Sequence, residues 1–276
     1  MPPNPFQYTA DQLAAAAKRV RRNIILMNST TGAGHTGADL SEADILVTLY
    51  FSVLRYDRAL DHPFRDRFIL SKGHGAGGFY CTLSEAALIP KELLSTYQAF
   101  DSSLQGHPVK QKIKAVEINT GALGHGFPVA VGLALAAKMN RRPGRIFVLL
   151  GDGELQEGSN WEAAMSASRF GLDNLMVVVD RNKLQLADRT EHIMGLEPLQ
   201  AKFEAFGFRV YTADGNDITS LLQCLDTWEA TRKDQPSVLL ASTVKGKGVS
   251  FMEDNPAWHH RIPKGVEVEQ ALKELE

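Results

Sequence analysis

Four of the eight histidines in the chain directly follow a glycine, which places a proton-carrying side chain where the backbone can turn sharply or approach a ligand closely. The four are His35, His74, His107 and His125. A single pair of this kind is most simply a loop histidine packed for structural reasons. Four together favour a functional site in which imidazoles exchange protons near neutral pH.

Two polar side chains follow directly after apolar segments that are typical of buried strands. Asp152 comes after residues 145–150 (RIFVLL), and Asn182 comes after residues 175–180 (LMVVVD). In an open parallel sheet, ligands bind beyond the carboxyl ends of the strands, and neighbouring strands lie about 4.8 Å apart. If these strands are neighbours, a carboxylate and an amide oxygen converge on one small volume. With a backbone carbonyl from the turn, they form a hard-oxygen ligand set that suits Mg²⁺ or Ca²⁺ and not Zn²⁺.

The tripeptide Gly151-Asp152-Gly153 favours an anionic ligand beside that metal. Its glycines expose the backbone, and a helix predicted to follow directs its N-terminus at the loop, which suits a diphosphate. Mg²⁺ commonly takes phosphate oxygens for its remaining ligand positions. Because Asp-Gly is also a common turn dipeptide, the specificity comes from the preceding strand, the following helix and Asn182 together.

The apolar patterns also predict the elements that position these groups. In the first half, helices are expected over 10–27, 43–54 and 77–87, with a short strand over 67–70, and Ser41 and Asp44 have the spacing of a capping box. In the second half, strands and helices alternate, with strands at 145–150, 175–180, 208–212 and 237–241 and helices at 157–170, 199–206 and 218–232. Such alternation is typical of an α/β fold with an open, mostly parallel sheet and helices on both faces. We expect a single domain over residues 1–265 and a charged C-terminal tail over 266–276.

The composition excludes several classes of protein. The chain has 276 residues, with 30 Lys and Arg against 32 Asp and Glu and 44% hydrophobic residues, which is ordinary for a globular protein. The near-neutral charge gives no electrostatic reason to expect a nucleic-acid or membrane partner. The two cysteines lie far apart, and the first residues lack the pattern of a signal peptide, so we expect a reducing, cytoplasmic compartment. The uncharged stretch 118–137 contains a continuous apolar run too short to cross a membrane.

The stretch GDGELQEGSNWEAAMSASRFGLDNLMVVVDRN resembles the fingerprint of the thiamine-diphosphate enzymes, which runs from GDG to an Asn. The chain as a whole is most similar to the N-terminal half of transketolase, from about residue 10 to residue 263. The matching motifs, in chain order, are GHTG at 34–37, LSKGHG at 70–75, GHP at 106–108, TGALGHG at 120–126 and WH at 258–259.

The resemblance implies a role for individual residues. Mg²⁺, which Ca²⁺ or Mn²⁺ can replace, would be held by Asp152, Asn182 and the carbonyl of Leu184. His35, His107 and His259 would line the sugar-phosphate channel and handle hydroxyl protons. The cofactor contacts implied are those of His74, Gly121, Ala122, Leu123, Gly153, Glu157, Asn182 and His259, with Glu157 near a subunit interface.

The chain departs from the family pattern at four positions. Arg181 precedes Asn182 where the family commonly has a pair of asparagines, a tolerable change because only Asn182 occupies the ligand position. Ala122 replaces the usual Pro and His125 the usual Gln, and neither change removes a metal ligand. His260 stands where a glycine often follows the histidine. Either His259 or His260 could therefore face the substrate, and we assign that position to His259.

The resemblance also implies a missing half. In this family the Glu that activates thiamine lies in a second, pyrimidine-binding domain, and the residues after the last predicted strand are too few to form one. We therefore expect a partner, a C-terminal transketolase subunit that supplies this domain and its catalytic Glu, in an α2β2 heterotetramer. The implied reaction transfers a two-carbon ketol unit from a ketose phosphate to an aldose phosphate.

Three alternatives are weaker. The chain could be a subunit of another thiamine-diphosphate enzyme, similar to deoxyxylulose-phosphate synthase or a 2-oxoacid decarboxylase, but the spaced Gly-His motifs favour transketolase. It could be a cofactor-binding regulatory subunit, but the intact set of candidate ligands argues against this. A nucleotide-binding Rossmann protein is disfavoured because no G-x-G-x-x-G follows a first strand.

Overall fold

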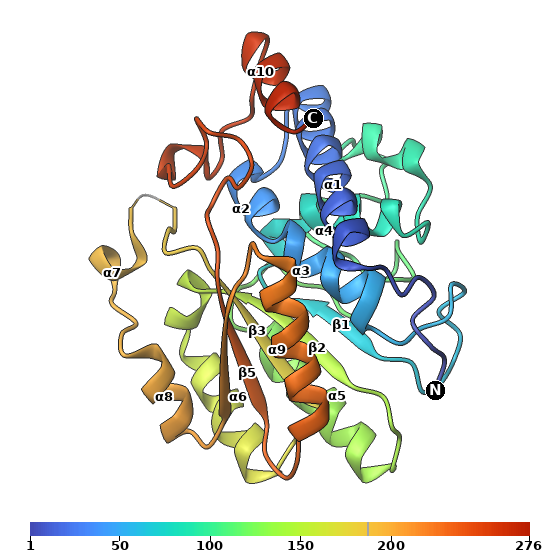
Figure 1. The fold of residues 1–276 in the computed structure, drawn as a ribbon, viewed down its shortest axis with the longest axis vertical. Coiled ribbons are helices and arrows are strands. Elements are labelled where there is room, and N and C mark those ends of the chain that lie inside the picture. The colour runs from blue at the N-terminus through green and yellow to red at the C-terminus, as the bar shows by residue number, and fades with distance from the viewer. Residues whose placement is uncertain (187) are drawn as a thin grey trace.

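A five-stranded parallel sheet forms the centre of the molecule (Figure 1). The computed structural model describes residues 1–186 and 188–276. The strand order is β1-β2-β3-β5-β4. The strands are β1 (Arg67–Leu70), β2 (Ile146–Gly151), β3 (Leu175–Arg181), β4 (Arg209–Asp214) and β5 (Ser237–Ser242). Since all neighbouring pairs are parallel, the carboxyl ends of the strands meet at one edge of the sheet.

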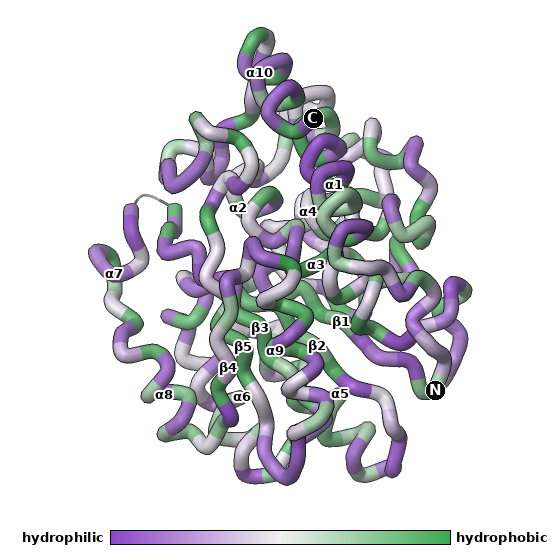
Figure 2. Tube along the Cα trace, viewed as in Figure 1, coloured by the Kyte–Doolittle hydropathy of each residue, from purple (hydrophilic) through white to green (hydrophobic). Residues whose placement is uncertain are grey.

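The central strands are buried on both faces, which explains why they are continuously apolar in sequence. In β2, Phe147 and Leu149 pack into one hydrophobic core, whereas Ile146, Val148 and Leu150 pack into the other. Figure 2 shows these hydrophobic strands at the centre of the chain trace. The two cores fix the register, because a shift by one residue would exchange the faces of every side chain.

Helices cover both faces of the sheet. The larger core lies under α1 (Ala10–Thr31), α3 (Ala43–Thr48), α4 (Ala76–Glu85) and α9 (Ile218–Thr231). The smaller core lies under α5 (Gly126–Met139), α6 (Gly158–Arg169) and α8 (Leu199–Ala205). The shorter elements are α2 (Thr36–Ser41), α7 (Thr190–Ile193), a π-helical turn η1 (Leu49–Val53), and the 3₁₀ turns η2 (Gly73–Gly75), η3 (Lys91–Thr96), η4 (Gly153–Gln156) and η5 (Pro256–Trp258).

The predicted α/β fold class is confirmed, and the predicted strands are all present with small differences at their ends. One helix was predicted wrongly. The segment expected as a single helix over 43–54 is α3 followed by η1, and Ser41 does not cap it, because Ser41 is the last residue of α2. Its hydroxyl instead donates to the buried carboxylate of Asp180 at 2.7 Å.

Residues 266–276 contain a packed helix, α10 (Val266–Glu274), which lies beside α1 (Figure 1). Ala271 and Leu275 are buried in the larger core, and the guanidinium of Arg22 donates to the carbonyl of Leu272 at 2.8 Å. The apolar face of this helix thus continues the core, although the sequence of the segment is mostly charged.

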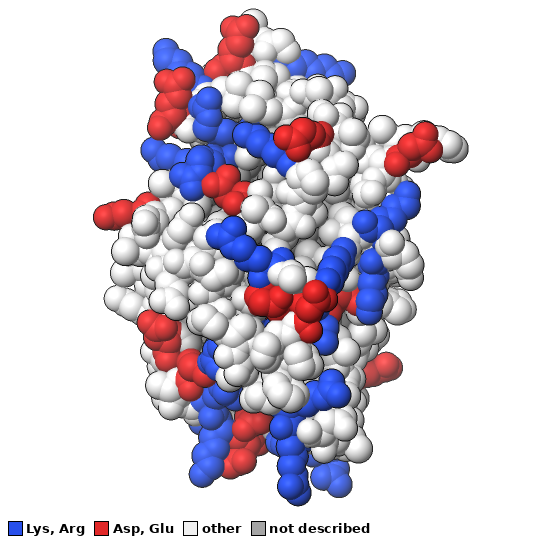
Figure 3. Space-filling model, turned by 90° about the vertical axis from the view of Figure 1, so that its right-hand side faces the viewer, with Lys and Arg blue, Asp and Glu red and all other residues white. Residues whose placement is uncertain are grey.

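Within the described ranges, no helix is both long and apolar enough to span a bilayer. On the face shown in Figure 3, basic and acidic side chains are interspersed. This distribution agrees with the near-neutral charge of the sequence.

Candidate active site

A cleft of about 410 Å³ opens at the carboxyl edge of the sheet. Its walls come from the segments that directly follow β1, β2, β3 and β5, together with α2, the loop before α5 and the chain around η5. Open parallel sheets bind ligands at this edge, where the loops after the strands are not packed in the hydrophobic core.

Asp152 and Asn182 lie on adjacent strand ends, as the sequence predicted. β2 and β3 pair in parallel, with Gly151 opposite Asp180, so the residues after them face the same cleft. The carboxylate of Asp152 accepts from the backbone N–H groups of Gly153 at 2.8 Å and Lys183 at 2.7 Å. These bonds tie the two turns together and fix the direction of the carboxylate.

The amide of Asn182 is also held in one orientation. Its Nδ2 lies 3.5 Å from the hydroxyl of Ser41 and 3.4 Å from the carboxylate of Asp180, both of which can accept its hydrogens. Its Oδ1 accepts from the N–H of Leu184 at 3.1 Å. The amide oxygen and the Leu184 carbonyl therefore belong to the same turn, which lines the cleft.

These donors fit a divalent cation. Asp152 is only 2% exposed, and no ion pair in the described part of the chain includes it. Burial, followed by the nearby Asp180 carboxylate, raises its pKa to about 6. A buried carboxylate without a cation, beside an amide oxygen and a carbonyl, is the ligand chemistry that Mg²⁺ prefers.

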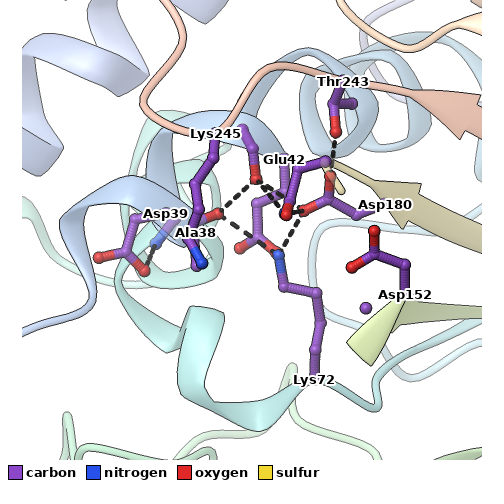
Figure 4. A network of polar contacts seen from close by, with 12 residues as sticks. Ala38, Asp39, Glu42, Lys72, Asp152, Asp180, Thr243 and Lys245 are labelled. Atoms are coloured by element: carbon purple, nitrogen blue, oxygen red, sulfur yellow. Dashed lines mark hydrogen bonds and ion pairs between the residues drawn. The ribbon is translucent and has the colours of Figure 1, made fainter. Parts of the chain in front are cut away.

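A buried ionic network lies next to the turns that contain Asp152 and Asn182 (Figure 4). The ammonium of Lys72 lies 2.6 Å from Asp180 and 2.9 Å from Glu42, and all three side chains are at most 1% exposed. Burial would lower the pKa of Lys72, but the two carboxylates outweigh it and hold that pKa above its ordinary value. Burial likewise would raise the pKa of Asp180, and Lys72 reverses the shift, so Asp180 stays ionised and able to orient Asn182.

A second buried lysine, Lys245, follows β5 and reaches across the cleft. Its ammonium donates to the carbonyl of Leu184 at 3.2 Å and lies 2.7 Å from Nδ1 of His259. Burial, then the nearby charge of Lys72, lowers its pKa to about 8. Since it still carries a proton at neutral pH, Lys245 donates to Nδ1, which leaves the proton of a neutral His259 on Nε2.

Four histidines lie close together in the cleft, namely His35, His74, His259 and His260. The ring of His35 lies 5.3 Å from that of His74, 5.5 Å from that of His259 and 4.4 Å from that of His260, measured between centroids. Burial, followed by the charge of His260, lowers the pKa of His35 to about 4, and burial, followed by Lys245, lowers the pKa of His259 to about 3. These imidazoles are therefore neutral at pH 7 and can both accept and donate hydrogen bonds.

The glycine-rich loop at 120–126 forms one wall. Gly121 and Leu123 line the cleft, whereas the side chain of Ala122 is exposed and points outside its lining. His107 is also outside the cleft lining, and its ring packs against Gly121. Gly121 has a φ of +135°, and a Cβ there would lie about 2.9 Å from the His107 ring, so only glycine fits at this position.

The cleft brings together most of the residues singled out from the sequence. The residues that line it are His35, His74, Gly121, Leu123, Asp152, Gly153, Glu157, Asn182, Leu184 and His259. His260 also lines it, so the structure places both histidines of the His259-His260 pair at the cleft.

Sequence reasoning did not select Lys72, Lys245 or Glu154, all of which line the cleft and are at most 2% exposed. Lys72 lies inside the LSKGHG motif, which was the only signal for it. Lys245 could have been found as the first charged residue after a predicted strand.

Comparisons with known proteins agree with this geometry. Residues 12–275 match the family described as "Transketolase, thiamine diphosphate binding domain". The chain is 54% identical over 274 residues to one of the subunits of apulose-4-phosphate transketolase from Actinobacillus succinogenes, covering 99% of both chains. It is 39% identical to one of the subunits of 6-deoxy-6-sulfo-D-fructose transketolase from Clostridium sp., over 89% of each chain. Among solved structures, transketolase from Campylobacter jejuni superposes with a TM-score of 0.88 at 30% identity, and the chain spans 97% of its own length but 43% of that one.

The chain therefore belongs to the transketolase family and comprises its thiamine diphosphate-binding domain. The resemblance inferred from the motifs is confirmed, and so is the prediction of an N-terminal subunit of a split transketolase.

Proposed function

We propose that this chain works as the diphosphate-binding subunit of a two-chain transketolase that uses Mg²⁺ and acts on a branched pentulose phosphate of the apulose 4-phosphate type. The observation that carries the proposal is the 54% identity over 99% of both chains to a relative named for that activity, combined with a cleft that holds a complete candidate ligand set. Sugar phosphates of this kind are metabolites of the cytoplasm, where we place the enzyme.

The chain's own residues would hold the cofactor at its charged end. Asp152, Asn182 and the carbonyl of Leu184 would bind Mg²⁺, and Ca²⁺ or Mn²⁺ could replace it because the donors are all hard oxygens. Gly153, His74 and Lys245 would meet the diphosphate with a backbone that carries no side chain, an imidazole and an ammonium. Bound thiamine diphosphate supplies the carbanion chemistry that cleaves and forms the carbon–carbon bonds.

The histidines would manage the hydroxyl protons of the sugar. His35 and His259 are neutral at pH 7. His35 can accept a proton from one hydroxyl or donate a hydrogen bond to another. His259, whose Nδ1 accepts from Lys245, can donate through Nε2. Lys245 favours the tautomer of His259 that carries its proton on Nε2, so that this nitrogen is a hydrogen-bond donor. His107, just outside the cleft lining, would reach the substrate from the side of Gly121.

The second half of the active site would come from a partner chain. The names of the relatives, which describe them as subunits, support such a division. We propose an α2β2 assembly in which the partner supplies the pyrimidine-binding domain and its catalytic Glu. Glu157, exposed at the rim of the cleft beside α6, would contact it.

Co-expression with the partner chain tests the proposal. The purified complex should convert apulose 4-phosphate in the presence of an aldose phosphate, thiamine diphosphate and Mg²⁺, and release no CO₂ from 2-oxo acids. Parallel reactions with xylulose 5-phosphate and with 6-deoxy-6-sulfo-D-fructose test the substrate class, and a preference for either would contradict the branched-sugar assignment. An Asp152→Ala complex with undiminished turnover would show that the metal site is not where we place it.

A further inference from the structure

Glu154 is a buried acid whose role the proposed chemistry leaves unexplained. It lies in η4, two residues after Asp152, and is 2% exposed. No ion pair within residues 1–186 and 188–276 includes it. Burial raises its pKa, while hydrogen bonds to its carboxylate oppose that shift.

The carboxylate of Glu154 accepts hydrogen bonds from three separate segments. Oε1 accepts from the hydroxyl of Ser71 and from the N–H of Gly124 at 3.0 Å, and Oε2 accepts from the N–H of Gly151 at 3.2 Å. Ser71 follows β1, Gly124 belongs to the glycine-rich loop before α5, and Gly151 ends β2. One side chain therefore joins three segments that are distant in sequence.

Each of these segments carries residues that line the cleft. Ser71 immediately precedes Lys72 and lies three residues before His74. Gly124 follows the wall formed by Gly121 and Leu123, and Gly151 immediately precedes Asp152. The carboxylate of Glu154 therefore links three neighbouring walls of the cleft. A carboxylate can accept all three hydrogen bonds at once, and bonds to a charged acceptor are about twice as strong as neutral ones.

We propose that Glu154 is a positioning residue for the cofactor, a clamp that sets the distance between the glycine-rich loop, the turn after β1 and the metal-ligand turn. This proposal rests on the proposed function, which places thiamine diphosphate and Mg²⁺ in the cleft. In this proposal Glu154 acts through its hydrogen bonds to Gly124, Gly151 and Ser71.

The substitution Glu154→Gln tests the hydrogen bonds of the carboxylate while it keeps the volume of the side chain. Glutamine has the same shape, but its NH₂ group must face one of the donors, so at least one of the three bonds is lost and two donors meet. Glu117 provides a matched control, because it is also a buried acid with both oxygens engaged, here by Arg65 and Arg67, and it does not line the cleft. Glu117→Gln should lower stability without changing the cleft.

Two measurements test the clamp. Hydrogen–deuterium exchange of the chain should accelerate at the amides of Gly124 and Gly151 in Glu154→Gln, and at neither amide in Glu117→Gln. In the complex with the partner chain, the Kd for thiamine diphosphate at saturating Mg²⁺ should rise about tenfold in Glu154→Gln, which corresponds to about 1.4 kcal/mol, and less than twofold in Glu117→Gln.

A failure of the clamp can be distinguished from a failure of the proposed function. An unchanged Kd in Glu154→Gln, or faster exchange spread evenly over the chain, overturns the clamp and leaves Glu154 a general stabilising residue. If Glu154→Gln does not fold, Ser71→Ala removes one bond of the clamp and should raise the Kd about threefold, and no rise overturns the proposal. Absence of ketol transfer by the unmodified complex would reject the proposed function, whereas the exchange measurement does not depend on that activity.

Discussion

Replacing Lys72 by methionine should cost the fold about 3–5 kcal/mol of unfolding free energy. Methionine matches the length of the lysine stem but leaves the carboxylates of Glu42 and Asp180 without their cation, and both are fully buried. Removing one partner of a buried ion pair costs about that much, because the remaining charge loses its only compensation. For a domain of this size the loss corresponds to a fall in Tm of roughly 6–20 °C.

The loss of unfolding free energy caused by Lys72→Met should depend on pH, and the structure predicts the direction of this dependence. Burial already raises the pKa of Glu42, and Lys72 is the group that lowers it most. Without Lys72, the folded state binds a proton at Glu42 more tightly than the unfolded state does. The stability of the variant relative to the unmodified chain should therefore recover as the pH falls from 8 towards 5.

Urea denaturation at pH 8 and pH 5 measures both effects. Lys110→Met is the control, because Lys110 is exposed and forms no ion pair in the described part of the chain, so its loss should stay within about 0.5 kcal/mol. In a double-mutant cycle, Lys72→Met combined with Glu42→Gln should show a coupling of about 1–3 kcal/mol. A loss below about 1 kcal/mol at pH 8, or additive effects of the two substitutions, would refute the reasoning.

Three further perturbations have defined outcomes. Burial lowers the pKa of His35 to about 4, so the folded chain loses stability as the pH falls from 6.5 towards 4. His35→Gln should remove about 2 kcal/mol of that loss at pH 5, measured by urea denaturation. If the variant and the unmodified chain lose stability equally in acid, the prediction is wrong. Gly124→Ala should destabilise the chain by about 2–4 kcal/mol, because its φ is +80° and a Cβ would lie 2.6 Å from Glu157 and Ser159. Gly132→Ala, in α5 and with open space around it, should instead stabilise the chain by about 0.5–1 kcal/mol. Thermal unfolding of the two variants compares these effects. Removal of divalent cations with EDTA should lower ketol transfer by the complex more than about tenfold and Mg²⁺ should restore it; activity that survives dialysis against EDTA would exclude an exchangeable metal.

The chemistry at the ends of β2 and β3 could be predicted from the sequence because each strand contains a run of five apolar residues, with Asp152 or Asn182 directly after the strand. Parallel pairing then brings Asp152 and Asn182 to the same edge, and pairing of consecutive strands is common. The Gly-His pairs also predicted residues of the cleft, because repeated Gly-His pairs are unusual and indicate loops near a ligand.

Other features could not be predicted because they depend on long-range packing. β5 lies between β3 and β4, so Lys245 stands next to the turn of Asn182, and nothing in the chain order indicates that insertion. Lysine is rarely buried, so no pattern in the sequence pointed to Lys72 as a residue of the core. Ser41 has the spacing of a helix cap, yet the buried carboxylate of Asp180 binds its hydroxyl more favourably.

The strand order also affects how the chain reaches its active form. The cleft takes its walls from segments that follow four different strands, and these strands are separated by helices and loops along the chain. The complete cleft requires β1, β2, β3 and β5 to have paired, so under the proposed function cofactor and metal would favour the folded state over partly folded ones. At a ligand concentration of 100 times its Kd, this selection adds about 2.7 kcal/mol to stability. Under the proposed function, the concentration of thiamine diphosphate would therefore affect the folding stability of the chain as well as the rate of catalysis.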